Sequence, residues 1–267
     1  MSGLVSFLLK AKRRWLQLAS FAIMNSVVLQ GAKSIPCLGM NCYACPAAIF
    51  ACPIGTLQHF AALRQIPFYT LGVLSLVGVL VGRSACGWLC PFGWLQELAY
   101  GLGRRLRWPQ RRVSDRFGRL PYLFLIVLAI AVPMLTLVPW FSKLCPVGTL
   151  EAGIPWVLID PALRSQVGTL YGLKLAILAA FVVWMVLTKR PFCRFVCPLG
   201  AIWSPFNRVS SLHLAVEEAS CTQCGVCQRV CPVDIRIYED AGSTRCVRCM
   251  ECVKACPEGA IRLTGHF

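Results

Sequence analysis

The chain is short of charged side chains and rich in apolar ones. Charged residues make up 14% of its 267 residues, whereas hydrophobic residues make up 57%. This composition is too apolar for an ordinary soluble domain and is typical of a membrane protein. We therefore expect a mainly α-helical membrane protein.

Histidine is scarce, which excludes several cofactors. The three histidines are His59, His213 and His266. No two of them lie within the apolar runs, so a bis-histidine haem b is excluded, and no C-x-x-C-H motif attaches a haem c. No G-x-G-x-x-G follows a strand, as flavin or nicotinamide binding would require, and no Ser/His/Asp arrangement stands out. We expect no catalytic residues, with the chemistry supplied by bound cofactors.

Acidic residues are also few, 11 against 27 lysines and arginines. Nucleic-acid binding is the usual alternative for so basic a chain, and the run "RRLRWPQRR" at 104–112 would suit RNA. However, the positive charge lies beside apolar runs, where it favours contact with lipid headgroups. We expect membrane lipid as a partner and no nucleic acid.

Four apolar runs are long enough to cross a bilayer, which takes roughly 20 residues. The first resembles a cleaved signal peptide, but no convincing cleavage site follows it and more runs come after it, so we interpret it as a retained helix. The four predicted spans lie at 15–32, 65–82, 120–142 and 165–188.

Lysine and arginine predict the orientation of these spans. Sixteen basic residues flank the spans on one side, against five on the other. The richer side should face the cytoplasm. We therefore expect a multi-pass protein of the cytoplasmic membrane with both termini inside and the loops at 33–64 and 143–174 outside.

Cysteine, in contrast, is abundant, with 17 residues. The tail reads "CTQCGVCQRVCP" from Cys221 and "CVRCMECVKACP" from Cys246. Each run is C-x-x-C-x-x-C-x-x-x-C-P, the pattern of two-cluster ferredoxins, in which the fourth cysteine serves the other cluster. Zinc is the alternative. We predict a membrane domain at 1–209 and an α+β ferredoxin domain at 210–267. The ferredoxin domain should bind two [4Fe–4S] clusters. The expected ligands of one are Cys221, Cys224, Cys227 and Cys256, and those of the other are Cys246, Cys249, Cys252 and Cys231.

A second pattern, C-x-x-x-C-P-x-G, follows the second and fourth predicted spans. It contributes Cys86 and Cys90 from one loop and Cys193 and Cys197 from the other, all at the cytoplasmic face. The proline suits the first turn of a helix, whose N-terminus favours an anionic cluster. We predict a third [4Fe–4S] cluster here, with a reduced thiol pair or a redox disulfide as the alternative.

The shorter element C-P-x-G occurs four times, at Cys52, Cys90, Cys145 and Cys197. The four copies alternate between the outer and inner faces, which suggests an internally repeated membrane unit. By analogy with the inner site, we predict a fourth [4Fe–4S] cluster outside, with disulfides as the alternative. Its expected ligands are Cys42, Cys45, Cys52 and Cys145, with Cys37 as the spare thiol.

Paired C-x-x-x-C-P motifs after apolar spans, followed by a two-cluster ferredoxin tail, resemble the NapH/NosR/CcoG group of membrane polyferredoxins. The resemblance is closest to the NapH type. It implies electron transfer from quinol to partner oxidoreductase subunits that carry iron–sulfur clusters or haem. The outer stretch "CLGMNCYACPAAIFACPIG" departs from that pattern.

The function expected is that of an iron–sulfur electron-transfer subunit, or quinol dehydrogenase, between the quinone pool and a partner oxidoreductase. Because the bilayer core is about 30 Å thick, the clusters must be recessed or a bound quinone must assist. Quinol oxidation needs a base, for which His59, Glu151 and Glu97 are candidates, although each also suits a polar interface. The alternatives are a cluster-dependent accessory protein, such as a metal reductase or maturation factor, and a thiol redox sensor.

Overall fold

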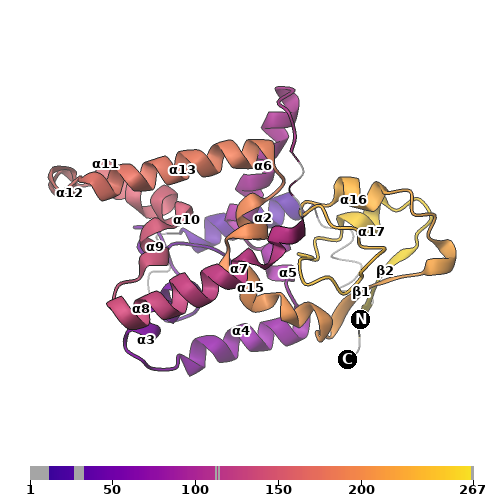
Figure 1. Ribbon diagram of the computed structural model, residues 1–267, viewed down its shortest axis with the longest axis horizontal. Coiled ribbons are helices and arrows are strands. Elements are labelled where there is room, and N and C mark those ends of the chain that lie inside the picture. Colours follow the sequence, from indigo (N-terminus) through magenta and orange to yellow (C-terminus); the bar gives the residue numbers. More distant parts are fainter. Residues whose placement is uncertain (1–11, 27–32, 112, 114, 266–267) are drawn as a thin grey trace.

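The computed structural model describes residues 12–26, 33–111, 113 and 115–265. The described chain is mostly helical, with one two-stranded sheet near its C-terminus (Figure 1). In chain order the elements are α2 (Arg13–Met24), α3 (Pro53–Ala62), α4 (Phe68–Val81), α5 (Ser84–Trp88), α6 (Pro91–Arg105), η2 (Asp115–Arg119), α7 (Leu120–Leu123), η3 (Phe124–Ala131), α8 (Val132–Thr136), α9 (Trp140–Leu144), α10 (Pro146–Gly148), η4 (Thr149–Gly153), α11 (Ile154–Ile159), α12 (Pro161–Ser165), α13 (Thr169–Leu187), α14 (Pro191–Phe195), α15 (Pro198–Trp203), η5 (Pro205–Arg208), β1 (Leu212–Val216), η6 (Glu218–Ser220), α16 (Val226–Val230), α17 (Glu251–Ala255) and β2 (Ile261–Gly265).

Two helices in the described part of the chain are long and apolar enough to cross a membrane. They are Phe117–Thr136, which joins η2 to α8, and α13. They coincide with the third and fourth predicted spans. The second predicted span forms α4, which is apolar but has only 14 residues. Four spans are therefore not established.

The first predicted span coincides only in part with a described helix. Its first half forms α2, and 27–32 lie outside the described residues. One face of α2 is polar and buried: Gln17 donates to the carbonyl of Gly87, and Ser20 donates to that of Leu89. The helix therefore packs against the loop that carries the first inner motif.

Two helices contain π-helical turns, and proline explains both. The segment η3 ends two residues before Pro133, and η4 ends two residues before Pro155. Proline has no N–H to donate and its ring crowds the preceding turn, so a wider turn relieves the clash. The long helix Phe117–Thr136 thus continues through Pro133.

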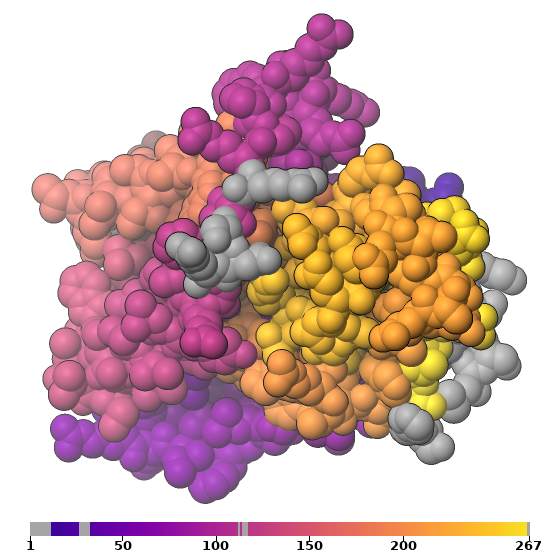
Figure 2. All heavy atoms as spheres, turned by 45° about the vertical axis from the view of Figure 1, so that its right-hand side comes forward, coloured from indigo at the N-terminus to yellow at the C-terminus, as the bar shows by residue number. Residues whose placement is uncertain are grey.

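The C-terminal residues form a compact lobe around the sheet. Strand β1 pairs with β2 in antiparallel register, with Leu214 opposite Leu263. Two short helices, α16 and α17, lie against each other. The lobe packs over a broad area against the earlier part of the chain (Figure 2).

Helix α6 packs closely against α13 at Gly103. A Cβ on Gly103 would lie 2.5 Å from the carbonyl oxygen of Val186, whereas a Cβ on Gly101 would meet no atom within 4 Å. The two helices therefore approach closely only because position 103 has no side chain.

We expect Gly103→Ala to destabilise the protein by about 1–3 kcal/mol, the usual cost of overpacking. The matched change Gly101→Ala adds the same methyl group to the same helix and should be neutral or slightly stabilising, because alanine favours the helix. Thermal unfolding of both variants in detergent measures the difference. Equal stability of the two variants would contradict the close packing.

Candidate iron–sulfur sites

All four C-P-x-G elements have the same local structure. In each, the cysteine is the N-cap of a helix, with φ near −70° and extended ψ, and the proline is the first helical residue. The N–H of the glycine then points back at the sulfur. It lies 3.5 Å from the thiol of Cys52 and 3.4 Å from that of Cys197. The element thus aims a helix N-terminus at its own thiol, which suits an anionic ligand.

The four inner cysteines come together from two loops. Burial raises the pKa of Cys197 well above that of an ordinary thiol, and Cys193, Cys86 and Cys90 raise it further. Burial, Cys193 and Cys86 likewise raise the pKa of Cys90 to about 12. Thiols with these pKa values stay protonated at neutral pH unless a metal binds them, so the chemistry of the group suits iron.

Two buried arginines join the inner motifs reciprocally. Arg83 and Arg190 each lie three residues before the first cysteine of their own motif. Arg83 donates to the carbonyl of Cys193 (2.7 Å), and Arg190 donates to the carbonyl of Cys86 (3.0 Å). Sequence reasoning missed this pair, although the repeat R-x-x-C-x-x-x-C-P-x-G contained the signal.

The glycine of each inner motif makes room for the arginine of the other. A Cβ on Gly93 would lie 3.1 Å from the Arg190 guanidinium, and a Cβ on Gly200 would overlap that of Arg83. The glycine of each inner motif therefore leaves space for an arginine, in addition to the backbone N–H that it places near the sulfur.

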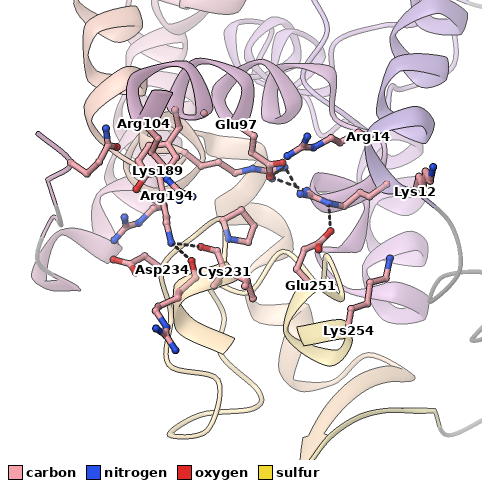
Figure 3. A pocket seen from close by; sticks show the side chains of 18 of the residues that line it. Lys12, Arg14, Glu97, Arg104, Lys189, Arg194, Cys231, Asp234, Glu251 and Lys254 are labelled. Carbon is pink, nitrogen blue, oxygen red and sulfur yellow. Dashed lines mark hydrogen bonds and ion pairs between the residues drawn. The ribbon is translucent and has the colours of Figure 1, made fainter. Parts of the chain in front are cut away.

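Glu97 balances this buried positive charge. It accepts hydrogen bonds from Arg13 (2.9 and 2.6 Å) and pairs with Arg190 (2.7 Å). Arg13 also pairs with Glu251 on α17 (3.2 Å), so one network joins α2, α6 and the C-terminal lobe (Figure 3). Burial alone would raise the pKa of Glu97, but the guanidiniums of Arg190 and Arg13 hold it below its ordinary value.

The outer cysteines also gather in one place. Burial raises the pKa of Cys145 to about 12, with Cys52 and Cys42 adding to the effect. The pKa of Cys42 is raised to about 12 by burial, Cys52 and Cys45. The four thiols expected at the outer site are thus neighbours. Cys37 also lies close enough to Cys52 for that cysteine to raise its pKa, although burial is the larger cause.

Buried polar side chains orient the outer loops. Gln58 exchanges two hydrogen bonds with Ser142, at 2.7 and 3.2 Å. Glu151 accepts from the N–H of Cys42 (2.7 Å). Gln58 and Glu151 each lie six residues after the cysteine of their C-P-x-G element, and so does Gln96, which donates to the thiol of Cys193 (3.1 Å). This position therefore ties each of these elements to another cysteine-bearing loop.

The stretch "CLGMNC" at 37–42 connects the outer and inner groups. A Cβ on Gly39 would lie 3.1 Å from Cys90 Cα, and the backbone amide of the next residue, Met40, opposes the rise in the pKa of the Cys90 thiol. From Met40 to Cys42 the chain spans at most about 7 Å. The two groups are therefore far closer than the roughly 30 Å thickness of a bilayer core, as recessed sites require.

The two tail repeats share an unusual backbone. The residues flanking the second cysteine have positive φ in both, at Gln223 and Gly225 in one and at Arg248 and Met250 in the other. These conformations are strained for residues other than glycine. They direct backbone N–H groups towards sulfur, and the N–H of Arg248 lies 3.3 Å from the thiol of Cys246.

Two cavities lie among the tail cysteines. The fourth cysteine of each run lies with the first three of the other run. One cavity is lined by Cys221, Cys224, Cys227 and Cys256, and the other by Cys231, Cys246, Cys249 and Cys252, with Cys227 beside them. Among the described residues, no three His, Cys, Asp or Glu side chains are close enough to hold a single metal ion. Cysteines arranged around a cavity fit a [4Fe–4S] cluster, which spreads its ligands over the corners of a cube.

The second tail repeat docks directly on the first inner motif. Trp88 donates to the carbonyl of Arg248 (3.0 Å), and Gly87 lies so close to the carbonyl of Val247 that any Cβ would overlap it. The guanidinium of Arg248 is buried and donates to the carbonyl of Asn207 (2.6 Å). The loop that carries Cys246 and Cys249 therefore faces the inner cysteines.

The three candidate bases have different surroundings. Glu97 is paired with two arginines. Glu151 is mostly buried against the Cys42 backbone, and burial raises its pKa to about 7. His59 is exposed and lines a cavity of about 360 Å³ together with Tyr43 and Gln58.

Comparisons with known proteins also identify iron–sulfur binding motifs in this chain. Two family models, each described as a 4Fe-4S binding domain, match the chain: one covers residues 50–69, 66–109 and 173–215, and the other covers 214–237 and 243–262. An uncharacterized protein of Methanocaldococcus jannaschii is 30% identical over 226 residues, which cover 81% of this chain and 87% of the relative. The ferredoxin-type protein NapH of Escherichia coli is 24% identical over 229 residues (80% of this chain, 75% of the relative).

The chain belongs to the NapH-like family of [4Fe–4S] polyferredoxins. A further relative, the methylamine utilization ferredoxin-type protein MauN of Methylorubrum extorquens, is 29% identical over 185 residues, which cover 68% of this chain and 55% of the relative. No solved structure matches this polyferredoxin. The matched ranges contain both inner motifs, the outer element at Cys52 and all eight tail cysteines.

Removing the charge of Glu97 should destabilise this polyferredoxin strongly. In Glu97→Gln, Arg190 would be buried without its counter-charge, which typically costs about 3–5 kcal/mol. Because the pKa of Glu97 is lowered, its contribution is present at neutral pH and lost as the pH falls through that pKa, below the ordinary value of about 4.3. Thermal unfolding at neutral pH should show the loss.

Glu239→Gln is the matched control, because Glu239 pairs with Arg236 on the surface, where both side chains are 55% exposed. Such pairs contribute little, so this variant should stay within about 0.5 kcal/mol of the parent chain. A Glu97→Gln variant as stable as the control would show that the buried network is not needed.

Proposed function

We propose that the chain is an integral-membrane electron-transfer subunit that works between the quinone pool and a partner oxidoreductase. Its cysteines would hold four [4Fe–4S] clusters, two in the tail, one at the inner face and one at the outer face. When bound, the clusters supply one-electron chemistry. The iron–sulfur electron-transfer role rests on the family; membrane placement, cluster number and quinone are the proposal.

The observation that supports this proposal best is the continuity of the four thiol groups. Gly39 brings the outer loop against Cys90 of the inner group. Trp88 joins the inner loop to the second tail repeat through Arg248. The two tail groups adjoin each other, and Cys224 at the far end is exposed. Such a series suits the passage of electrons from one end of the molecule to a partner at the other.

A quinol site beside the outer group would complete the series. The cavity that His59 lines also contacts Gly55, whose N–H points at the Cys52 thiol. Quinol oxidation releases protons, and the exposed His59 imidazole can act as the base that accepts one. We assign His59 this role in the proposal, because Glu97 and Glu151 are both held by other groups.

The cluster number is tested by iron and acid-labile sulfide analysis of anaerobically purified protein. We expect about sixteen irons per chain, at four per cubane. Cys193→Ser with Cys197→Ser, and separately Cys42→Ser with Cys145→Ser, should each lower the count to about twelve. Cys37→Ser is the matched control and should keep sixteen.

Other counts would revise the proposal in defined ways. About eight irons in the parent chain would confine clusters to the tail and overturn the membrane sites. About twelve, with no effect of the Cys42 and Cys145 changes, would assign the outer cysteines to disulfides. Loss of four irons in Cys37→Ser would place Cys37 among the outer ligands.

The quinone proposal is tested by His59→Gln. Because a positioned base typically contributes 10²–10⁴-fold, we expect cluster reduction by a quinol to slow at least about 100-fold in this variant. Reduction by dithionite should be unchanged. His213→Gln, in β1 of the C-terminal lobe, is the control. Equal quinol rates in all three chains would sink the assignment of His59.

A further inference from the structure

A large cleft separates the C-terminal lobe from the helices before it. Its volume is about 1180 Å³, slightly above the usual range of small-molecule sites. One wall comes from the start of α2 and one face of α6, and the opposite wall comes from the Cys231 loop and α17 (Figure 3). At one point the walls are bridged by Lys189, whose amine donates to the carbonyl of Cys231 (3.1 Å).

The cleft carries far more positive than negative charge. Ten of its lining side chains are lysine or arginine, and three are carboxylates. Two of the carboxylates, Glu97 and Glu251, are already paired within the Arg13 network. Lys12, Arg14, Arg104, Arg111 and Arg229 form no ion pair with any residue that the structure describes. Like charges on facing walls repel each other, so an anion between them would be strongly attracted.

The cleft lies at one end of the candidate span α13. The N–H of Arg111 donates to the carbonyl of Leu187, the last residue of that helix (2.9 Å). By the charge asymmetry of the loops, this end faces the cytoplasm. A basic site at this level meets the anionic headgroups of the inner leaflet.

Exposed apolar side chains continue outward from the same two helices. Trp15 lines the cleft and is 66% exposed. On α6 and just beyond it, Leu98, Leu102 and Leu106 are exposed and follow one another at four-residue intervals, which forms a stripe along the helix. An anionic amphiphile binds through cations that contact its headgroup and apolar surface that contacts its chains. A soluble acidic protein would be bound by the cations alone, and the exposed leucines would stay uncovered. The combination favours a lipid.

We propose that this cleft binds the phosphate headgroup of an anionic phospholipid from the cytoplasmic leaflet. The headgroup neutralises cations on both walls and so holds the C-terminal lobe against the helices, while the acyl chains lie along the exposed side chains of α2 and α6. The inference rests on the proposed membrane placement of α13, but it needs neither the quinone nor the outer cluster.

The test uses the full chain with its clusters in nanodiscs of phosphatidylcholine containing a small fraction of phosphatidylglycerol. Native mass spectrometry after release counts the lipids that stay bound. We expect selective retention of phosphatidylglycerol, weakened about 30-fold in the double variant Arg104→Gln, Arg229→Gln, which removes one cation from each wall. The control double variant Arg236→Gln, Arg262→Gln makes the same charge change at two exposed positions outside the cleft and should retain the lipid.

Equal retention by the two double variants, or no preference of the parent chain for phosphatidylglycerol, would overturn the proposal. A second arm adds soluble glycerol 3-phosphate to the protein in neutral detergent and measures thermal unfolding. If this probe stabilises the chain as much as phosphatidylglycerol does, the cleft takes a free phosphate compound and the lipid assignment is wrong. Quinol-driven cluster reduction in pure phosphatidylcholine reports on the electron-transfer proposal separately.

Discussion

The structure depends on positive charge buried between the two inner motifs. Arg190 is completely buried and Arg83 nearly so, and each donates to a cysteine carbonyl of the opposite loop. A buried guanidinium is costly unless it is paired and hydrogen-bonded. Glu97 and the carbonyl acceptors stabilise the buried guanidiniums only when both loops are in place. The position of the inner cysteines is therefore coupled to that of α2, α6 and the C-terminal lobe.

The same arrangement suits an anionic prosthetic group. Thiolates in a buried site repel one another, and guanidiniums close by offset this repulsion. Arg83 opposes the effect of burial on the pKa of Cys86. The glycine N–H groups at the short helix N-termini act in the same direction. The cysteines are thus surrounded by three kinds of positive group. These are the two arginines, several backbone N–H groups and the N-terminal ends of helices.

Close backbone approach is the second constraint, and it shortens the path between sites. Gly39 lies on Cys90, Gly87 lies on Val247, and Gly103 lies on Val186. An added Cβ would overlap backbone atoms at Gly87 and Gly103 and would be tightly packed at Gly39. The first two bring the outer loop and the tail repeat against the inner motif, so that the groups of cysteines follow one another without intervening layers.

The sequence by itself determined what depends on short spacing. The helix that begins at each C-P-x-G proline follows from residues a few positions apart, and the family and the expected grouping of the tail cysteines follow from the repeated cysteine motifs. Only the tertiary structure decided the exchange of Arg83 and Arg190, the approach of Gly39 to Cys90, and the cleft between the lobe and α6, because these join residues about 50 to more than 100 positions apart. Apolar runs likewise predicted where helices lie but not their length. In the run at 65–82, α4 has only 14 residues because it begins after Pro67, and at its other end Gly82, with a φ of 61°, leaves no room for a Cβ beside the Arg248 guanidinium of the docked lobe.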